Sequence, residues 1–231
     1  MPQTYELSAA QLARQIRKKK ITPVEVAQSL LERMDSLEPQ LDAWVRVNRE
    51  TVLADAEQRQ VELESGAATG PLHGVPIGIK DIYNIAGTPT TAGSKVYADY
   101  VPDETAVTID LLQKAGAIML GKTVTTEFAC LDPSHTKNPW NPAHTPGGSS
   151  SGSAVSVAAR MCPIAMGSQT VGSVLRPASY NGITGLKPTY GRVSRRGVVP
   201  VSWSLDTVGW MGRSVEDMAL LLQVLAAPDE L

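Results

Sequence analysis

The chain has 231 residues, of which 42% are hydrophobic and 19% are charged, a composition that excludes a disordered protein and indicates a globular one. Its 21 basic and 23 acidic residues nearly balance, so no excess charge indicates a nucleic-acid or membrane-surface partner. The sequence has no apolar run of about 18 residues that would predict a membrane span, and its N-terminus lacks the apolar stretch of a signal peptide. Cys130 and Cys162 form no CxxC motif, so we expect a cytoplasmic protein in which both are small core residues.

The first 66 residues are predicted to be helical. Ser8 and Gln11 have the spacing of a capping box, and Thr22 and Glu25 repeat it. Apolar residues at four-residue spacing then predict an amphipathic helix over residues 22–34. A third helix is predicted over residues 50–64, before Gly66.

Strands and helices alternate in the rest of the chain. Short apolar runs predict buried strands at residues 74–82, 117–120 and 163–167, and helical patterns lie at residues 104–116, 152–160 and 214–227. Residues 131–148 have the proline and asparagine content of a loop. We therefore predict an α/β fold with a largely parallel sheet covered by helices. One domain is expected over residues 1–231, with N-terminal helices in 1–66 and the α/β core in 67–231.

The stretch GAIMLGKT, residues 116–123, matches the Walker A phosphate-binding pattern. A phosphate-binding loop needs an open backbone between its glycines, with N–H groups that point inward. Here the intervening residues are Ala117, Ile118, Met119 and Leu120, which are typical of a buried strand. We therefore do not expect nucleotide binding.

Two serine-containing stretches are candidate sites. The run GGSSSGS, residues 147–153, is either a flexible linker or a site, because Ser149, Ser150 and Ser151 precede a predicted helix. Ser173 follows Gly172 before another predicted helix start, where free backbone N–H groups can form an oxyanion hole. His144 is a formal candidate for its base, but nothing in the sequence places it near Ser173. No histidine spacing indicates a metal site.

Lys80 is the stronger candidate for a base. It ends the apolar run GVPIGIK, and burial there would lower its pKa until the neutral amine accepts a proton. The alternative is that Lys80 reaches solvent or pairs with Asp81 as a surface ion pair.

Taken together, these stretches resemble the amidase signature family. The matching segments are GPLHGVPIGIKD, GAIMLGKT, NPWNPAHTPGGSSSGSA and the segment that begins GSQTVGSVLRPAS, in the family's order. The resemblance implies a Ser–cis-Ser–Lys triad that hydrolyses carboxamides without a metal or cofactor. Lys80 matches the triad lysine, Ser149 the bridging serine after a cis peptide bond, and Ser173 the nucleophile.

The resemblance also implies roles for neighbouring groups. The backbone N–H groups of Thr170, Val171, Gly172 and Ser173 would form the oxyanion hole. Ser150 would support the proton relay by hydrogen bonding, and Gly148 would leave room beside the cis bond.

The chain departs from the family pattern at three positions of the nucleophile turn. Gln169 replaces an acid, Val171 replaces a glycine, and the arginine is displaced by one position to Arg176. Val171 would be strained if its φ had to be positive. The chain is also about half the usual family length, so the sheet could be incomplete.

The resemblance implies an amidase that acts on linear amides, either small or aryl amides, with carbamates and esters as further substrates. Two alternatives are an amidotransferase A-type subunit that releases ammonia from glutamine, and an inactive half-fold that needs a partner. The expected partner is a small amide, with no nucleic acid or membrane. Homodimerisation, or a complementing C-terminal half, would fit the short chain.

Overall fold

The computed structural model describes residues 3–67 and 69–226. Its helices and strands, with three short 3-10 turns, follow one another along the chain as η1 (Thr4–Glu6), α1 (Ala9–Arg17), α2 (Pro23–Leu41), β1 (Trp44–Arg46), α3 (Arg49–Glu64), β2 (Pro76–Lys80), η2 (Lys95–Tyr97), α4 (Val107–Lys114), β3 (Ile118–Thr123), η3 (Glu127–Ala129), α5 (Ser151–Ala158), β4 (Ile164–Gln169), α6 (Leu175–Tyr180), β5 (Thr184–Leu186), β6 (Thr207–Gly212) and α7 (Val215–Leu225).

The described residues form one six-stranded sheet in the order β1-β3-β2-β4-β6-β5. β2 pairs with β3 and β4 in parallel, whereas β1, β6 and β5 join by antiparallel pairs. Four of the six strands (β2, β3, β4 and β5) consequently point in one direction. The predicted α/β fold with a largely parallel sheet is confirmed.

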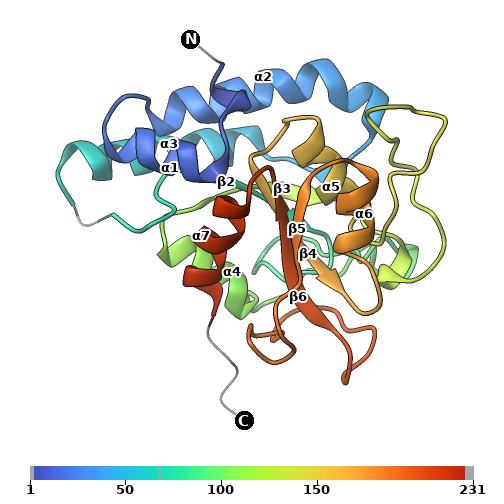
Figure 1. Cartoon of the computed structure of the whole chain (residues 1–231). Coiled ribbons are helices and arrows are strands. Elements are labelled where there is room, and N and C mark those ends of the chain that lie inside the picture. Colours follow the sequence, from blue (N-terminus) through green and yellow to red (C-terminus); the bar gives the residue numbers. More distant parts are fainter. Residues whose placement is uncertain (1–2, 68, 227–231) are drawn as a thin grey trace.

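Helices cover the sheet from both sides. Figure 1 shows α4 and α7 on one side of the strands, α5 and α6 on the other, and α2 across the top of the view. Ile77 and Ile79 of β2 are fully buried, as is Trp210 of β6. β2 therefore lies at the centre of the sheet with no solvent-facing side, which explains its unbroken apolar run.

The helix caps follow the predicted chemistry. Ser8 accepts a hydrogen bond from the Gln11 amide, and Thr22 accepts one from the Glu25 amide. α2 then continues to Leu41, well beyond the predicted end at residue 34, and stops where Asp42 takes a left-handed conformation. Helix α7 begins after its predicted cap, Ser214.

Several predictions need correction or lie outside the described residues. Cys162 is buried, but Cys130 is exposed because it follows the η3 turn in a surface loop. The three-residue strands β1 and β5 and the six-residue strand β6 were not predicted. The last residue of the predicted helix 214–227, Ala227, lies outside the described part of the chain.

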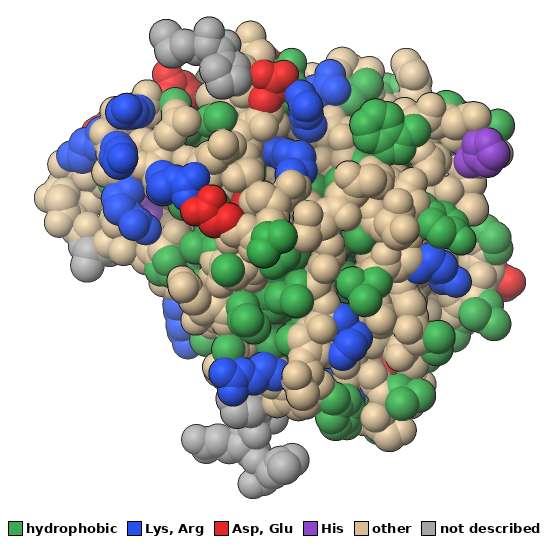
Figure 2. Space-filling model, viewed as in Figure 1, with side chains coloured by type: hydrophobic (Ala, Val, Ile, Leu, Met, Phe, Trp, Pro, Cys, Tyr) green, Lys and Arg blue, Asp and Glu red, His purple; other side chains and the backbone are tan. Residues whose placement is uncertain are grey.

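On the face that Figure 2 shows, Lys and Arg side chains are more prominent than Asp and Glu side chains. Lys and Arg side chains gather at the upper left of that view, over α1. Lys18, Lys19 and Lys20 follow the end of α1 and are exposed, where cations suit the helix dipole. Within the described residues, no helix combines the length and the apolar character needed to cross a membrane.

Candidate functional site

Lys80 ends the central strand β2, and its side chain is fully buried. Its Nζ donates hydrogen bonds to the hydroxyl of Ser149 at 2.7 Å and to that of Ser168 at 2.9 Å. Burial lowers the pKa of Lys80 to about 7, while the charge of Asp206 opposes this shift. The alternative of a surface ion pair between Lys80 and Asp81 is therefore wrong, and the amine is available as a neutral base near neutral pH.

Ser149 lies just before α5, which begins at Ser151. The peptide bond between Gly148 and Ser149 is cis, as the family resemblance led us to expect. Ser149 and Ser150 are fully buried. The stretch GGSSSGS is therefore not a flexible linker, because its serines are held inside the fold.

The segment that carries Ser173 lies beside the serine run. The backbone N–H of Ser150 donates to the carbonyl of Ser173 at 3.3 Å, and the Ser150 hydroxyl accepts a hydrogen bond from the Ser168 amide at 3.3 Å. In residues 3–67 and 69–226, the Ser173 hydroxyl has no hydrogen-bond partner. The fold thus places Ser149 against Lys80, and it places the Ser173 backbone against Ser150, the residue that follows Ser149.

The turn before Ser173 leaves its backbone donors free. Across the described residues, the N–H groups of Thr170, Val171, Gly172 and Ser173 donate to no protein acceptor. Val171 is 88% exposed and is not among the residues with positive φ. The β-branched side chain therefore needs no strained backbone here, and the N–H groups can face an anionic oxygen.

The side-chain amide of Gln169 stabilises this turn through both its oxygen and its nitrogen. Its Oε1 accepts hydrogen bonds from the amides of Val174 and Leu175 at 3.0 and 2.9 Å, and its Nε2 donates to the Val171 carbonyl at 3.2 Å. An acid at this position would keep the two acceptor contacts. Only the amide can add the donor that closes the turn across Val171.

The displaced arginine also has a defined place. Arg176 donates from Nε and Nη2 to the Gly148 carbonyl, at 3.0 and 2.7 Å. It lines a pocket of about 180 Å³ together with Gly148, Leu131 and Tyr180. A second depression is lined by Ser168, Asp206 and Trp203, among other residues.

Sequence reasoning missed Ser168 and Asp206. Asp206 accepts hydrogen bonds from the hydroxyl of Thr170 at 2.5 Å and from the amides of Val201 and Ser202. Ser168 is five residues before Ser173 in a run of small polar residues, which was the available signal. Asp206 has no such signal, because only the fold brings it to Thr170.

The other candidates do not join the site. His144 is exposed on the 131–148 loop, and its backbone N–H bonds to Asn141. No group of histidine, cysteine or acidic side chains within the described residues could hold a metal ion. Residues 118–123 of the Walker-like segment form strand β3, so their backbone is paired within the sheet and cannot surround a phosphate.

Comparisons with known proteins show the family to which the chain belongs. The family model described as Amidase matches residues 25–231. The A subunit of the glutamyl-tRNA(Gln) amidotransferase from Carboxydothermus hydrogenoformans is 45% identical over 231 residues, which cover 97% of this chain and 48% of that protein. The native peptide amidase from Stenotrophomonas maltophilia superimposes with a TM-score of 0.92 at 38% identity, covering 99% of this chain and 50% of that one.

A protein from a vestigial complex that bears on the origins of an s-triazine catabolic enzyme gives a TM-score of 0.93 at 33% identity, covering 96% of this chain and 50% of that one. The chain spans about half the length of the curated relatives it matches. The family match covers most of the sequence, and the two solved structures share the fold. The chain therefore belongs to the amidase family.

Proposed function

We propose that this chain carries the catalytic centre of a serine amidase that cleaves the C–N bond of a linear carboxamide. The contact that carries the proposal is the 2.7 Å hydrogen bond between the buried Lys80 amine and the Ser149 hydroxyl. A buried amine with a pKa of about 7 is matched to proton transfer at neutral pH. Small or aryl amides are the proposed substrates, and carbamates or esters would react by the same acyl chemistry.

The proposed reaction begins with proton transfer along the relay. Neutral Lys80 takes the proton of Ser149 as Ser149 takes that of Ser173, and the Ser173 oxygen forms a bond to the amide carbonyl carbon. The carbonyl oxygen becomes an oxyanion that accepts hydrogen bonds from the free N–H groups of residues 170–173. The C–N bond then breaks, and the leaving amine takes a proton returned through Ser149.

Water completes the cycle. It attacks the acyl-enzyme ester, loses its proton to the same relay and releases the carboxylic acid with the Ser173 hydroxyl restored. Each proton taken from a nucleophile returns to a leaving group, so the cycle balances without a cofactor.

Covalent labelling of the purified chain with a fluorophosphonate, followed by peptide mapping, tests the proposal. We expect an adduct on Ser173 that is lost in Ser173→Ala and in Lys80→Ala. Two matched controls, Ser179→Ala and Lys95→Ala, change exposed residues and should keep the label. A folded chain that gains no adduct, or gains one at another serine, would overturn the proposal.

A second candidate function is favoured by the curated relatives, several of which are named as the A subunit of a glutamyl-tRNA(Gln) amidotransferase. In that case the same relay would release ammonia from glutamine, within an assembly that includes other chains. Ammonia release from glutamine, compared with turnover of a simple aryl amide, separates the two candidates. A homodimer or a complementing C-terminal half is the proposed source of any missing substrate contacts.

A further inference from the structure

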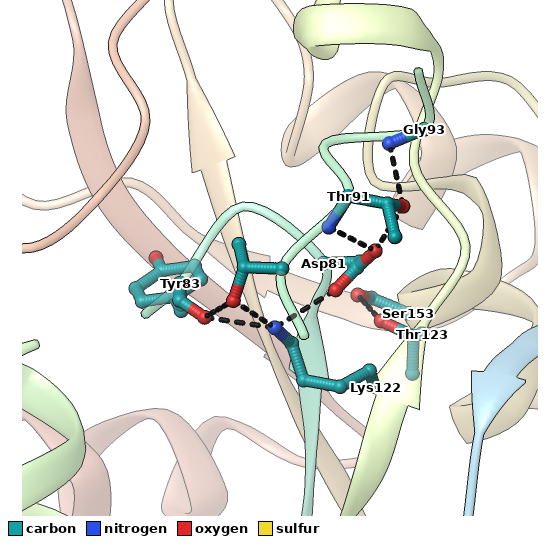
Figure 3. Close-up of polar contacts among 8 residues, drawn as sticks. Asp81, Tyr83, Thr91, Gly93, Lys122, Thr123 and Ser153 are labelled. Carbon is teal, nitrogen blue, oxygen red and sulfur yellow. Dashed lines mark hydrogen bonds and ion pairs between the residues drawn. The ribbon is translucent and has the colours of Figure 1, made fainter. Parts of the chain in front are cut away.

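We propose that Asp81 and Lys122 form a buried positioning pair that holds the two serine partners of Lys80 in place. Lys122 is the lysine of the Walker-like segment, and Asp81 directly follows Lys80. The Lys122 Nζ lies 2.8 Å from Asp81 Oδ1, and the two side chains are 2% and 0% exposed. Figure 3 shows Lys122 reaching from β3 toward Asp81 and the carbonyl of Tyr83.

Asp81 fixes the loop that follows β2. Its Oδ2 accepts hydrogen bonds from the Thr91 amide at 3.1 Å and from the Thr91 hydroxyl at 2.5 Å. Its backbone carbonyl accepts a further hydrogen bond from the Ala92 amide at 2.9 Å. Three contacts therefore hold residues 91 and 92 against the end of the strand that carries Lys80.

This loop in turn holds the segment that contacts Ser149. The Ala92 carbonyl accepts a hydrogen bond from the Phe128 amide at 2.7 Å, and the Thr126 amide donates to the Ser149 carbonyl at 3.2 Å. Gly93 lies so close that a Cβ there would come within 2.9 Å of the Thr125 carbonyl oxygen. A continuous set of contacts thus runs from Asp81 to the backbone of Ser149.

The contacts of Lys122 connect it to the segment that carries Ser168, the second hydrogen-bond partner of Lys80. Its Nζ donates to the Tyr83 carbonyl and to the Thr90 hydroxyl, each at 2.9 Å. The Tyr83 hydroxyl donates to the Gly167 carbonyl at 2.6 Å. Gly167 directly precedes Ser168, whose hydroxyl accepts from Lys80. The pair is therefore linked to both hydroxyls that receive hydrogen bonds from the Lys80 amine.

Neither member of the pair contacts Lys80 Nζ or Ser173, so both are positioning residues. Removing only one partner would leave an uncompensated buried charge and would destabilise the fold for that reason alone. The informative variant replaces both partners with uncharged side chains of similar size. Asp81→Asn with Lys122→Met meets this condition.

The inference rests on the proposed function, because it assigns the pair to the same relay. In the double variant we expect kcat for an amide substrate to fall on the order of 10- to 100-fold, since misplacement of catalytic groups costs about that much. KM should change much less. The acid limb of kcat/KM should move to higher pH, because a loosened site admits water and burial of Lys80 is the main cause of its low pKa.

The other ionisable groups near Lys80 would not cause this move of the acid limb. Asp206 acts on Lys80 from the loop before β6 and is unchanged in the variant. The Tyr83 hydroxyl has a pKa raised by burial and stays neutral. Arg176 binds the Gly148 carbonyl and is also unchanged. Asp81 and Lys122 are neutralised together, so the variant has the same net charge.

A matched control removes an ion pair far from the relay. Arg49 and Asp35 lie 2.7 Å apart on the surface, and their side chains are 46% and 62% exposed. Arg49→Met with Asp35→Asn should leave kcat and the pH profile unchanged. Thr91→Val is a milder variant that removes the hydroxyl contact to Asp81 and the hydrogen bond that the same hydroxyl accepts from the Gly93 amide. It provides the test where the double variant does not fold, and it should lower kcat in the same direction.

The crystal structure of the double variant gives a readout that does not depend on turnover. We expect Lys80 Nζ to lose its hydrogen bond to Ser149 or to Ser168. A folded variant that keeps both hydrogen bonds and, where turnover is measurable, full kcat would overturn the positioning role. Absence of turnover and labelling in the unsubstituted chain would count against the proposed function alone, and the variant structure would still decide the inference.

Discussion

At the scale of single residues, the protonation of Lys80 governs the proposed chemistry. Its amine is fully buried, and its hydrogen-bond partners among the described residues are the hydroxyl groups of Ser149 and Ser168. Burial disfavours the ammonium form, which lowers the pKa from 10.5 to about 7. Below that pH the amine carries a proton and cannot accept another.

The first prediction follows from the direction of this pKa shift. The kcat/KM of an amide substrate should be constant above about pH 7 and should fall roughly tenfold for each pH unit below it. Asp206→Asn should move the acid limb to lower pH, because the charge of Asp206 raises the pKa of Lys80. Steady-state rates across buffers of equal ionic strength check both expectations. A profile without an acid limb near neutral pH would show that Lys80 is not the base.

Gln169 provides a second prediction at this scale. Gln169→Leu should lower the free energy of unfolding by about 1–2 kcal/mol, since it leaves the amides of Val174 and Leu175 without their acceptor. Gln169→Glu keeps an acceptor oxygen and should lose much less. Urea unfolding of the two variants makes the comparison, and equal losses would contradict the role of Gln169 as the acceptor for these two amides.

At the scale of elements, the docking of α5 sets the position of Ser149. Gly152 lies in the first turn of α5, where its amide donates to the Val124 carbonyl at 3.0 Å. A Cβ on Gly152 would come within 2.2 Å of the Ala43 carbonyl oxygen and 2.4 Å of the Val124 nitrogen. Both contacts are backbone atoms, so the helix itself would have to move.

We therefore predict that Gly152→Ala destabilises the fold by at least about 1–3 kcal/mol, the usual cost of overpacking. The matched control for stability is Gly172→Ala, because a Cβ there would lie 3.6 Å from the Arg176 Cβ, an ordinary contact distance. Thermal unfolding of both variants provides the measurement. Similar midpoints for the two variants would mean that α5 tolerates displacement.

The elements also show what could be predicted from the sequence. The capping boxes at Ser8 and Thr22 and the apolar run of β2 are local signals, and the structure confirms them. β6 was missed because its sequence, TVGWMG, contains two glycines and no alternating pattern, while its pairing with β4 is non-local. Asp206 was missed for the same reason, since its partner Thr170 lies 36 residues away.

At the scale of the whole molecule, apolar side chains are exposed on a loop beside the candidate site. Val201, Trp203 and Leu205 are 41%, 76% and 57% exposed. Trp203 lines the same depression as Ser168 and Asp206, so this loop borders the proposed relay. Exposed apolar surface of this kind favours association.

We predict that the chain self-associates through this loop. Trp203→Ser with Leu205→Ser should lower the apparent mass measured by light scattering across a concentration series, and stability should change by less than about 0.5 kcal/mol, as for other surface substitutions. The control, Val61→Ser with Val96→Ser, replaces side chains that are 59% and 79% exposed elsewhere on the surface. It removes exposed apolar area but leaves the loop intact, so it should not change the mass.

Equal effects of the two double variants would assign the association to general surface hydrophobicity, and a monomer at every concentration would contradict the prediction. A selective effect of the loop variant would place the interface at the edge of the candidate site, where a second chain could complete the substrate contacts.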